Sequence, residues 1–151
     1  MSRQLAPTSP AAPHVWWHAG RLRVGASDRA AAESILADFN LAAHGDRPAG
    51  ELSFGQRKLL EFAATLMSRP RLVLLDEPAA GVNPVLVERI EHHIRRLHGE
   101  GLTFLVVEHD MPFVMRLCEP VIVLDRGRTI AEGPAADVQL DPRVLDAYLG
   151  D

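Results

Sequence analysis

Residues 52–84, which read LSFGQRKLLEFAATLMSRPRLVLLDEPAAGVNP, decide the fold that the sequence predicts. Near the start of this stretch, Ser53 and Gln56 have the spacing of a capping box, which is typical of a helix N-terminus. Apolar residues then recur at helical spacing as far as Met67, so the segment predicts an amphipathic helix. Pro70 ends this helix, because proline cannot continue the helical hydrogen-bond ladder.

The start of this helix is a candidate anion-binding site. A helix N-terminus favours negative charge and offers free backbone N–H groups. The hydroxyl of Ser53 precedes these groups, and Gly55 lets a ligand approach the backbone closely. The combination predicts a site for a phosphate or a carboxylate.

A predicted strand at residues 72–75 follows the helix and leads into two carboxylates, Asp76 and Glu77. Four consecutive apolar residues suit a strand that is buried on both faces, and ligands of open α/β sheets bind at the carboxyl edge. One carboxylate could hold Mg²⁺ while the other handles a proton or orients water. Taken alone, the acidic pair is equally compatible with a buried strand that has an acidic cap on the next turn.

The remainder of the chain continues the α/β pattern. Asn83 and Pro84 predict the N-cap and first position of a further helix. Residues 102–107 predict a second buried strand, which ends at His109 with an acid on either side. The other predicted elements are a helix at 28–40 capped by Ser27, a helix from Pro112, a hairpin around 125–128 and a terminal helix from Pro142.

Four motifs in this order resemble those of the ATP-binding subunits of ABC transporters. They are the signature loop LSFGQ (52–56), the Walker B strand LVLLDE (72–77), the D-loop AAGVNP (79–84) and a switch histidine in VVEHD (106–110). The resemblance covers Pro48 to the C-terminus. DEPAAGVNP and the terminal AYLG are most similar to the ATPases of branched-chain amino acid importers.

The resemblance implies an α/β fold, the C-terminal part of a P-loop NTPase domain of the ABC ATPase type. A parallel sheet core with helices would be joined to part of the helical signature subdomain. We expect a flexible leader at 1–27 and a partial ABC ATPase domain at 28–151. Within that domain, 28–69 would be the helical signature region and 70–151 would run from Walker B to the C-terminus.

The resemblance also implies roles for the residues of the site, with ATP and Mg²⁺ as cofactors. Asp76 would hold Mg²⁺, Glu77 would polarise the attacking water and His109 would contact the γ-phosphate.

The signature loop and the D-loop supply the residues implied to bind the nucleotide. Ser53 and Gly55 would reach across to the nucleotide on a partner subunit, and Gln56 belongs to the same loop. Asn83 stands where many members carry the D-loop aspartate, so it keeps the hydrogen-bonding shape and loses the charge.

The sequence lacks a usable P-loop, which the resemblance leads us to expect. GRLRVGAS at 20–27 has the spacing G-x-x-x-x-G-K-[ST], but Ala26 replaces the lysine that reaches the phosphates. We therefore expect the C-terminal portion of an ATPase, from a truncated gene product or a late start codon, inactive by itself. The alternatives are a catalytically inactive module that docks on an intact ATPase, and an ABC ATPase used outside transport.

Composition limits the class of partner. The chain has 151 residues, enough for one domain, and its formal net charge of −4 gives no reason to expect nucleic acid. Cys118 is the single cysteine, which fits a reducing compartment. No apolar run is long enough to span a membrane, and prolines interrupt the N-terminal segment, so we expect a cytoplasmic chain. The resemblance implies a second ATPase subunit, in a homo- or heterodimer, and transmembrane permease subunits at the inner face of the plasma membrane as partners.

Overall fold

The computed structural model describes residues 24–149, so most of the predicted leader at 1–27 lies outside the described residues. The elements in chain order are α1 (Ala26–Asp38), η1 (Ala42–His44), η2 (Ala49–Glu51), α2 (Phe54–Thr65), η3 (Leu66–Ser68), β1 (Leu72–Asp76), α3 (Pro84–Gly99), β2 (Thr103–Val107), α4 (Met111–Leu117), β3 (Val121–Asp125), β4 (Arg128–Gly133), α5 (Ala135–Val138) and α6 (Pro142–Leu149). The predicted α/β class is confirmed.

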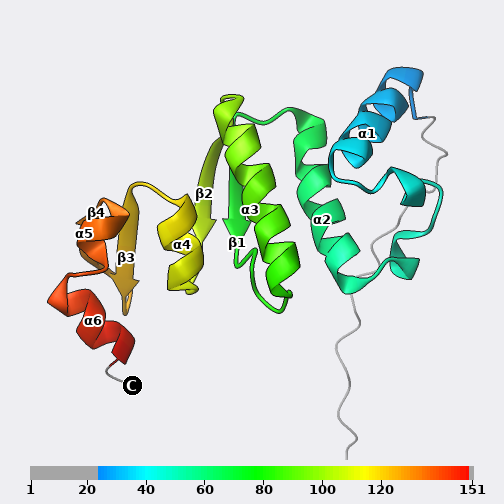
Figure 1. The fold of residues 1–151 in the computed structure, drawn as a ribbon. Helices are drawn as coiled ribbons and strands as arrows, with labels where there is room; N and C mark the ends of the chain where they lie inside the picture. Colours follow the sequence, from blue (N-terminus) through cyan, green and yellow to red (C-terminus); the bar gives the residue numbers. More distant parts are fainter. Residues whose placement is uncertain (1–23, 150–151) are drawn as a thin grey trace, which may run out of the picture.

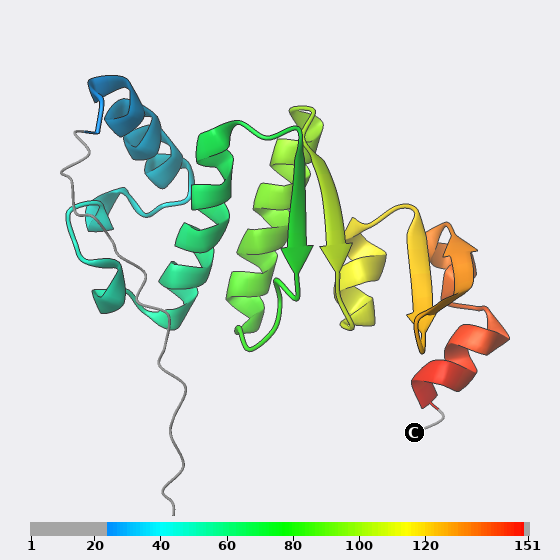
Figure 2. The same ribbon diagram turned by 180° about the vertical axis from the view of Figure 1, so that it is seen from behind.

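Strands β1 and β2 form a parallel pair at the centre of the molecule. Their register runs from Leu72 opposite Thr103 to Asp76 opposite Val107, and α3 makes the connection between them. Figure 1 shows α3 and α4 in front of the strands, and Figure 2 shows the strands from behind, with the helices on their far side. The arrangement is a βαβ unit, which brings the carboxyl ends of both strands to one edge.

The second sheet is the predicted hairpin of β3 and β4. The strands pair antiparallel and meet at a two-residue turn, Arg126 and Gly127, whose φ angles are 45° and 75°. Two successive positive φ angles are typical of a hairpin turn, and glycine adopts them without steric cost. β3 points the same way as β2 in Figure 1, but the two strands do not pair.

The main core lies between α2, α3 and one face of the β1–β2 pair. Its best-buried aromatic residues are Phe39, which follows α1, and Phe113 of α4, at 1% and 0% exposure. Leu59 and Phe62 of α2 pack in the same cluster as Ile90 of α3. A smaller cluster joins α4 to the hairpin, α5 and α6 through Val114, Val121, Ala131, Val138 and Val144.

The prediction that both central strands are buried on both faces was wrong for the described residues. Val73 is 4% exposed, whereas its neighbour Leu74 is 66% exposed, and Leu105 and Val107 of β2 are 52% and 58% exposed. Successive side chains of a strand point to opposite faces, and within residues 24–149 helices cover only one of them. The other face is therefore an open apolar surface.

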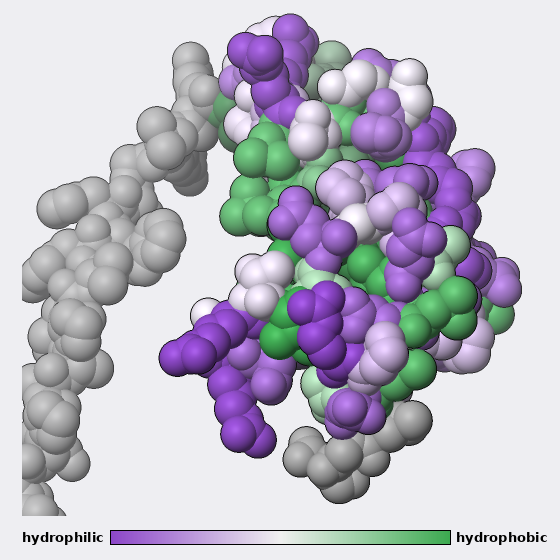
Figure 3. Space-filling view, turned by 90° about the vertical axis from the view of Figure 1, so that its left-hand side faces the viewer, coloured by the Kyte–Doolittle hydropathy of each residue, from purple (hydrophilic) through white to green (hydrophobic). Residues whose placement is uncertain are grey.

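Apolar side chains are also exposed at the end of the molecule formed by the hairpin and α6. Ile122 and Leu124 of β3 are 54% and 67% exposed, and Tyr148 of α6 is 61% exposed. Figure 3 looks at this end and shows green apolar side chains among the purple polar ones. The hairpin and α6 thus expose apolar side chains, as the central strands do.

The predicted cap of the first helix was wrong by two residues. α1 begins at Ala26 and its N-cap is Gly25, which makes no side-chain cap. The Gly25 carbonyl accepts the N–H of Arg29 at 3.0 Å, so Ser27 lies inside the first turn. Helix formation upstream of Ser27 removes the need for its hydroxyl at the cap.

Candidate functional site

The carboxyl edge of β1 and β2 gathers the three residues predicted to carry chemistry. Asp76 lies opposite Val107 in the register, and the backbone N–H of Glu77 donates to the Val107 carbonyl at 2.9 Å. The chain beyond Val107 leads directly to His109. Asp76, Glu77 and His109 therefore meet at one edge although Glu77 and His109 are 32 positions apart in the sequence.

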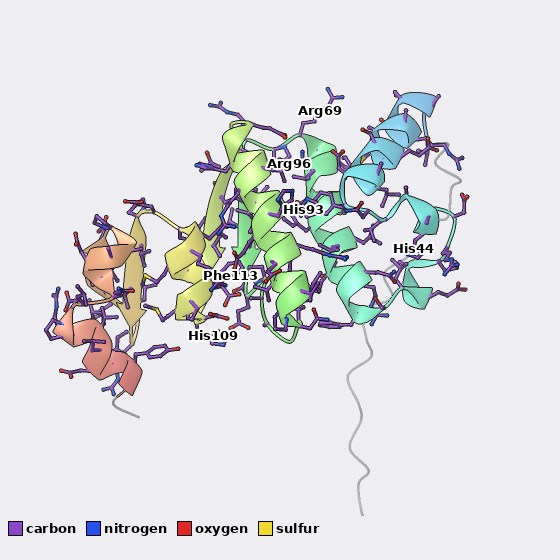
Figure 4. All side chains as sticks on the ribbon, viewed as in Figure 1. His44, Arg69, His93, Arg96, His109 and Phe113 are labelled. Atoms are coloured by element: carbon purple, nitrogen blue, oxygen red, sulfur yellow. The ribbon has the colours of Figure 1, made fainter. Side chains whose placement is uncertain are left out.

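Glu77 and His109 are in contact. The His109 Nδ1 lies 3.4 Å from the Glu77 Oε1, and the side chains are 75% and 54% exposed, respectively. Glu77 has a φ of 46°, in the left-handed region that few non-glycine residues adopt. Strained backbone of this kind is concentrated at functional sites. In Figure 4 the label of His109 lies just below the lower end of α4.

Asp76 fits a role as a magnesium ligand. Its side chain is exposed, and among residues 24–149 no side-chain hydrogen bond or ion pair engages its carboxylate. Mg²⁺ is commonly bound by one or two carboxylates together with waters and substrate phosphates. The described residues contain no cluster of three or more histidine, cysteine or acidic side chains that could hold a metal alone. A site completed by phosphate oxygens is compatible with this donor set.

Glu108 is a residue of the site that the sequence reasoning missed. Its Oε1 accepts the backbone N–H of Ala79 at 2.8 Å, and its Oε2 accepts that of His109 at 3.2 Å. One carboxylate thus ties the turn after β1 to the loop after β2 and sets the spacing between Glu77 and His109. The available signal was an acid at the end of an apolar strand, directly before the histidine.

The predicted capping box is present at the start of α2. Gln56 donates its N–H to the Ser53 Oγ at 3.2 Å, and its Oε1 accepts the N–H of Ser53 at 2.9 Å. The other end of the Gln56 amide, Nε2, lies 2.8 Å from the His44 Nε2. Both ends of the Gln56 side chain are therefore engaged within the chain, where they position Ser53.

Packing within the chain is a second reason for a glycine at position 55, in addition to the predicted close approach of a ligand. A Cβ at this position would lie 2.9 Å from the Cδ2 of Leu86 on α3, closer than van der Waals contact allows. The signature turn and the D-loop helix consequently touch. The ring of Phe54 also lies beside Gly81 of the D-loop, 3.9 Å from where a Cβ would be.

The helices α2 and α3 direct their N-termini to the same edge as the acidic residues (Figure 1). Asn83 caps α3 as predicted, because its Oδ1 accepts the N–H of Leu86 at 2.9 Å. Helix N-termini carry partial positive charge. The edge therefore combines carboxylates, a histidine and two helix ends, an arrangement suited to a metal-bound phosphate.

An ion-pair network around the buried carboxylate of Glu91 holds α4 behind this edge. The Glu91 carboxylate of α3 has 5% exposure and accepts from the Arg116 Nη2 of α4 at 2.6 Å and from the Arg95 Nη2 at 3.1 Å. The hydrogen bond from Arg116 to Glu91 is the main cause that raises the pKa of the Arg116 guanidinium. α4 begins two residues after His109, so the network fixes the element on which that loop depends.

Two other sequence features have no place at this edge. The P-loop-like stretch at 20–27 lies mainly outside the described residues, and its Ala26 and Ser27 belong to α1. Burial, followed by the charge of Glu108, raises the pKa of the Cys118 thiol, which therefore stays protonated near neutral pH.

In the described part of the chain no helix is both long and apolar enough to cross a membrane.

Comparison with known families agrees with the motif order. A family model described as "ABC transporter" matches residues 3–80, beginning well before Pro48. A second model, "Branched-chain amino acid ATP-binding cassette transporter", matches residues 128–151. The two matches lie at opposite ends of the chain.

Curated relatives and solved structures give the same result. The chain is 39% identical over 117 residues to the high-affinity branched-chain amino acid transport ATP-binding protein BraF of Pseudomonas aeruginosa, covering 77% of this chain and 46% of that protein. It is 40% identical over 121 residues to the probable branched-chain amino acid transport ATP-binding protein LivG of Methanocaldococcus jannaschii, covering 78% and 47%. The ADP conformation of an ATP-binding cassette of an ABC transporter superposes with a TM-score of 0.78 at 37% identity, covering 85% of this chain and 52% of that one. The chain thus spans about half the length of the curated relatives it matches.

Proposed function

This chain belongs to the ABC transporter family of ATP-binding proteins, and we propose that it carries the signature, Walker B and switch-histidine parts of an ATP-hydrolysing subunit. The observation that carries the proposal is the 3.4 Å contact between Glu77 and His109 beside the free carboxylate of Asp76. The proposed cofactors are ATP and Mg²⁺.

Each residue at the carboxyl edge has a proposed role. Asp76 binds Mg²⁺, because its oxygens are exposed and uncommitted among the described residues. Glu77 orients the attacking water and accepts its proton, and His109, in contact with it, donates a hydrogen bond to the terminal phosphate. When bound, Mg²⁺ neutralises part of the phosphate charge. Glu108 holds the two loops at the distance that this chemistry needs.

The signature turn is proposed to act on a nucleotide held by a second ATPase subunit. Ser53 and Gly55 offer a hydroxyl and a closely approachable backbone at a helix N-terminus. Gln56 contributes by fixing Ser53 through the capping box. Asn83 caps α3 and thereby places the D-loop beside the signature turn.

The transported substrate is proposed to be a branched-chain amino acid. This proposal rests on the names of the relatives and on the second family model. The partners would be a second ATPase subunit, identical or different, and permease subunits through which the chain associates with the inner face of the plasma membrane. We assign residues 28–69 to the helical signature region, residues 70–151 to the part from Walker B onward, and residues 1–27 to a leader.

A second candidate function is that of an inactive module that docks on an intact ATPase. The open apolar surface of β1 and β2 favours it, because parallel sheets are normally covered on both faces.

Hydrolysis by the isolated chain tests the division of roles. We expect no appreciable Mg²⁺-dependent phosphate release, because the given sequence has no lysine in a P-loop to cradle the phosphates. Glu77→Gln is the matched variant, since it removes the charge and keeps the shape. Clear phosphate release that Glu77→Gln abolishes would show that the chain is catalytically sufficient.

A further inference from the structure

His44 contacts the signature turn from the segment that precedes it. It is the last residue of η1, between α1 and α2, and Figure 4 labels it in this connecting segment. The segment is anchored in the main core, because Leu41 is 2% exposed and its carbonyl accepts the backbone N–H of His44 at 2.9 Å. The His44 Nε2 lies 2.8 Å from the Nε2 of Gln56, 12 positions further along the chain. An anchored histidine thus meets the residue that completes the capping box of Ser53.

The hydrogen bonds of Gln56 determine which nitrogen of His44 carries the proton. The Gln56 Oε1 accepts the backbone N–H of Ser53 at 2.9 Å, so the Nε2 is the end of the amide that faces His44. An amide NH₂ group only donates hydrogen bonds. The His44 Nε2 must therefore accept, and the ring is neutral with its proton on Nδ1. The reverse orientation of the amide would set the Gln56 NH₂ group against the N–H of Ser53.

The other ring nitrogen of His44 indicates that packing alone does not explain a histidine at this position. The His44 Nδ1 is buried and has no hydrogen-bond partner among residues 24–149. A buried unpaired N–H group is unfavourable, and an apolar side chain of similar size would avoid that cost. What the histidine adds is the acceptor at Nε2, which the Gln56 amide uses.

We propose that His44 is a positioning residue of the signature turn, which holds the Gln56 amide through its Nδ1–H tautomer and thereby fixes Ser53. The inference rests on the proposed function, in which Ser53 meets a nucleotide on a partner subunit. Without the acceptor on His44, the Gln56 amide is free to turn toward water, and the Ser53 N–H loses a prearranged partner. Groups that are already held in place cost less to order when a ligand binds than groups that move freely.

NMR of the full chain with ¹⁵N-labelled histidine tests the tautomer. Near neutral pH we expect His44 to carry its proton on Nδ1 and to have an unprotonated Nε2. A proton on Nε2 would overturn the proposal, because that nitrogen could not accept from Gln56.

Amide hydrogen exchange measures the effect of His44 on Ser53. His44→Phe keeps a ring and removes the acceptor, so it should speed exchange of the Ser53 N–H by about threefold to tenfold. His44→Gln can place an acceptor near the position of the Nε2 and should restore slow exchange. The N–H of Leu86, which Asn83 caps at the start of α3, should exchange as in the parent and reports any general loss of stability.

His98→Phe is the matched control. His98 also uses a ring nitrogen, since its Nδ1 donates to the Leu102 carbonyl at 3.1 Å, but it lies near the C-terminal end of α3. Its replacement should leave exchange at Ser53 unchanged. The proposal is overturned if His44→Phe leaves Ser53 unchanged or speeds Leu86 as much as Ser53, or if His44→Gln fails to restore slow exchange.

Stimulation of an intact partner ATPase separates this inference from the proposed function. With the chain at saturation, His44→Phe should lower the maximal stimulation by about threefold to tenfold, and His44→Gln should preserve it. Full stimulation by His44→Phe would overturn the inference. Absence of stimulation by the parent chain would instead refute the proposed action on a partner's nucleotide, and the tautomer and the exchange rates would still decide the role of His44.

Discussion

Replacing Gly55 by alanine tests whether the signature turn is held against the D-loop helix by packing. The new Cβ would lie 2.9 Å from the Leu86 Cδ2, and Leu86 is only 7% exposed, so its side chain has little room to move. Overpacking of this kind costs about 1–3 kcal/mol. Alanine recovers about 0.5–1 kcal/mol of that through its better helix propensity. We expect a net loss of roughly 1 kcal/mol in the free energy of unfolding.

Urea unfolding of a double-mutant cycle measures this effect. Leu86→Ala alone should destabilise by about 2–5 kcal/mol. Adding Gly55→Ala to it should cost nothing further, which gives a coupling energy of about 1 kcal/mol. Gly99→Ala is the matched control, because a Cβ at that end of α3 meets no atom within 4 Å. Additive effects in the cycle, or equal stability of Gly55→Ala and the parent, would refute the packing explanation.

Three further predictions follow from other parts of the structure. The open apolar surface should make the chain self-associate, and a monodisperse monomer in analytical ultracentrifugation would contradict this. Glu91→Gln should speed amide hydrogen exchange in α4, because it removes the charge that anchors that helix, whereas Glu88→Gln on the exposed side should not. The hydrogen bonds from Arg143 lower the pKa of Asp141. The stabilisation of the fold by ionised Asp141 is therefore fully present above the unfolded pKa of 3.8, and it is lost as the pH falls through the folded pKa. NMR should show that α6 frays on acidification and that this pH dependence disappears in Asp141→Asn. The same pH dependence in the variant and the parent would count against the role of Asp141.

Local signals in the sequence were enough to predict the helices and strands and to predict that Glu77 and His109 lie at the same edge. Ser53 with Gln56, and Asn83 with Pro84, are caps whose side chains act within three residues, so they can be predicted without tertiary structure. The parallel pairing then brings Glu77 and His109 to one edge, because ligand residues after adjacent parallel strands share that edge.

Contacts between distant segments were not predictable in the same way. Glu108 and Glu91 act on groups 29 and 25 residues away, and nothing in their neighbourhoods specifies those partners. The exposure of Leu74 and Leu105 also escaped prediction, because an apolar strand indicates burial on both faces whether or not the described chain supplies the covering elements.

The central claim is that the signature turn of this chain contacts a nucleotide held by a partner subunit. Asp76 and Glu77, in contrast, act at the nucleotide site of their own subunit. Steady-state ATP hydrolysis by an intact partner ATPase, with this chain added at saturation, measures it directly. We predict that the chain stimulates the partner, that Ser53→Arg removes the stimulation, and that Ser53→Thr, which keeps the capping hydroxyl, and Glu77→Gln both preserve it. Equal loss with Glu77→Gln and Ser53→Arg, or stimulation that survives Ser53→Arg, would contradict the claim.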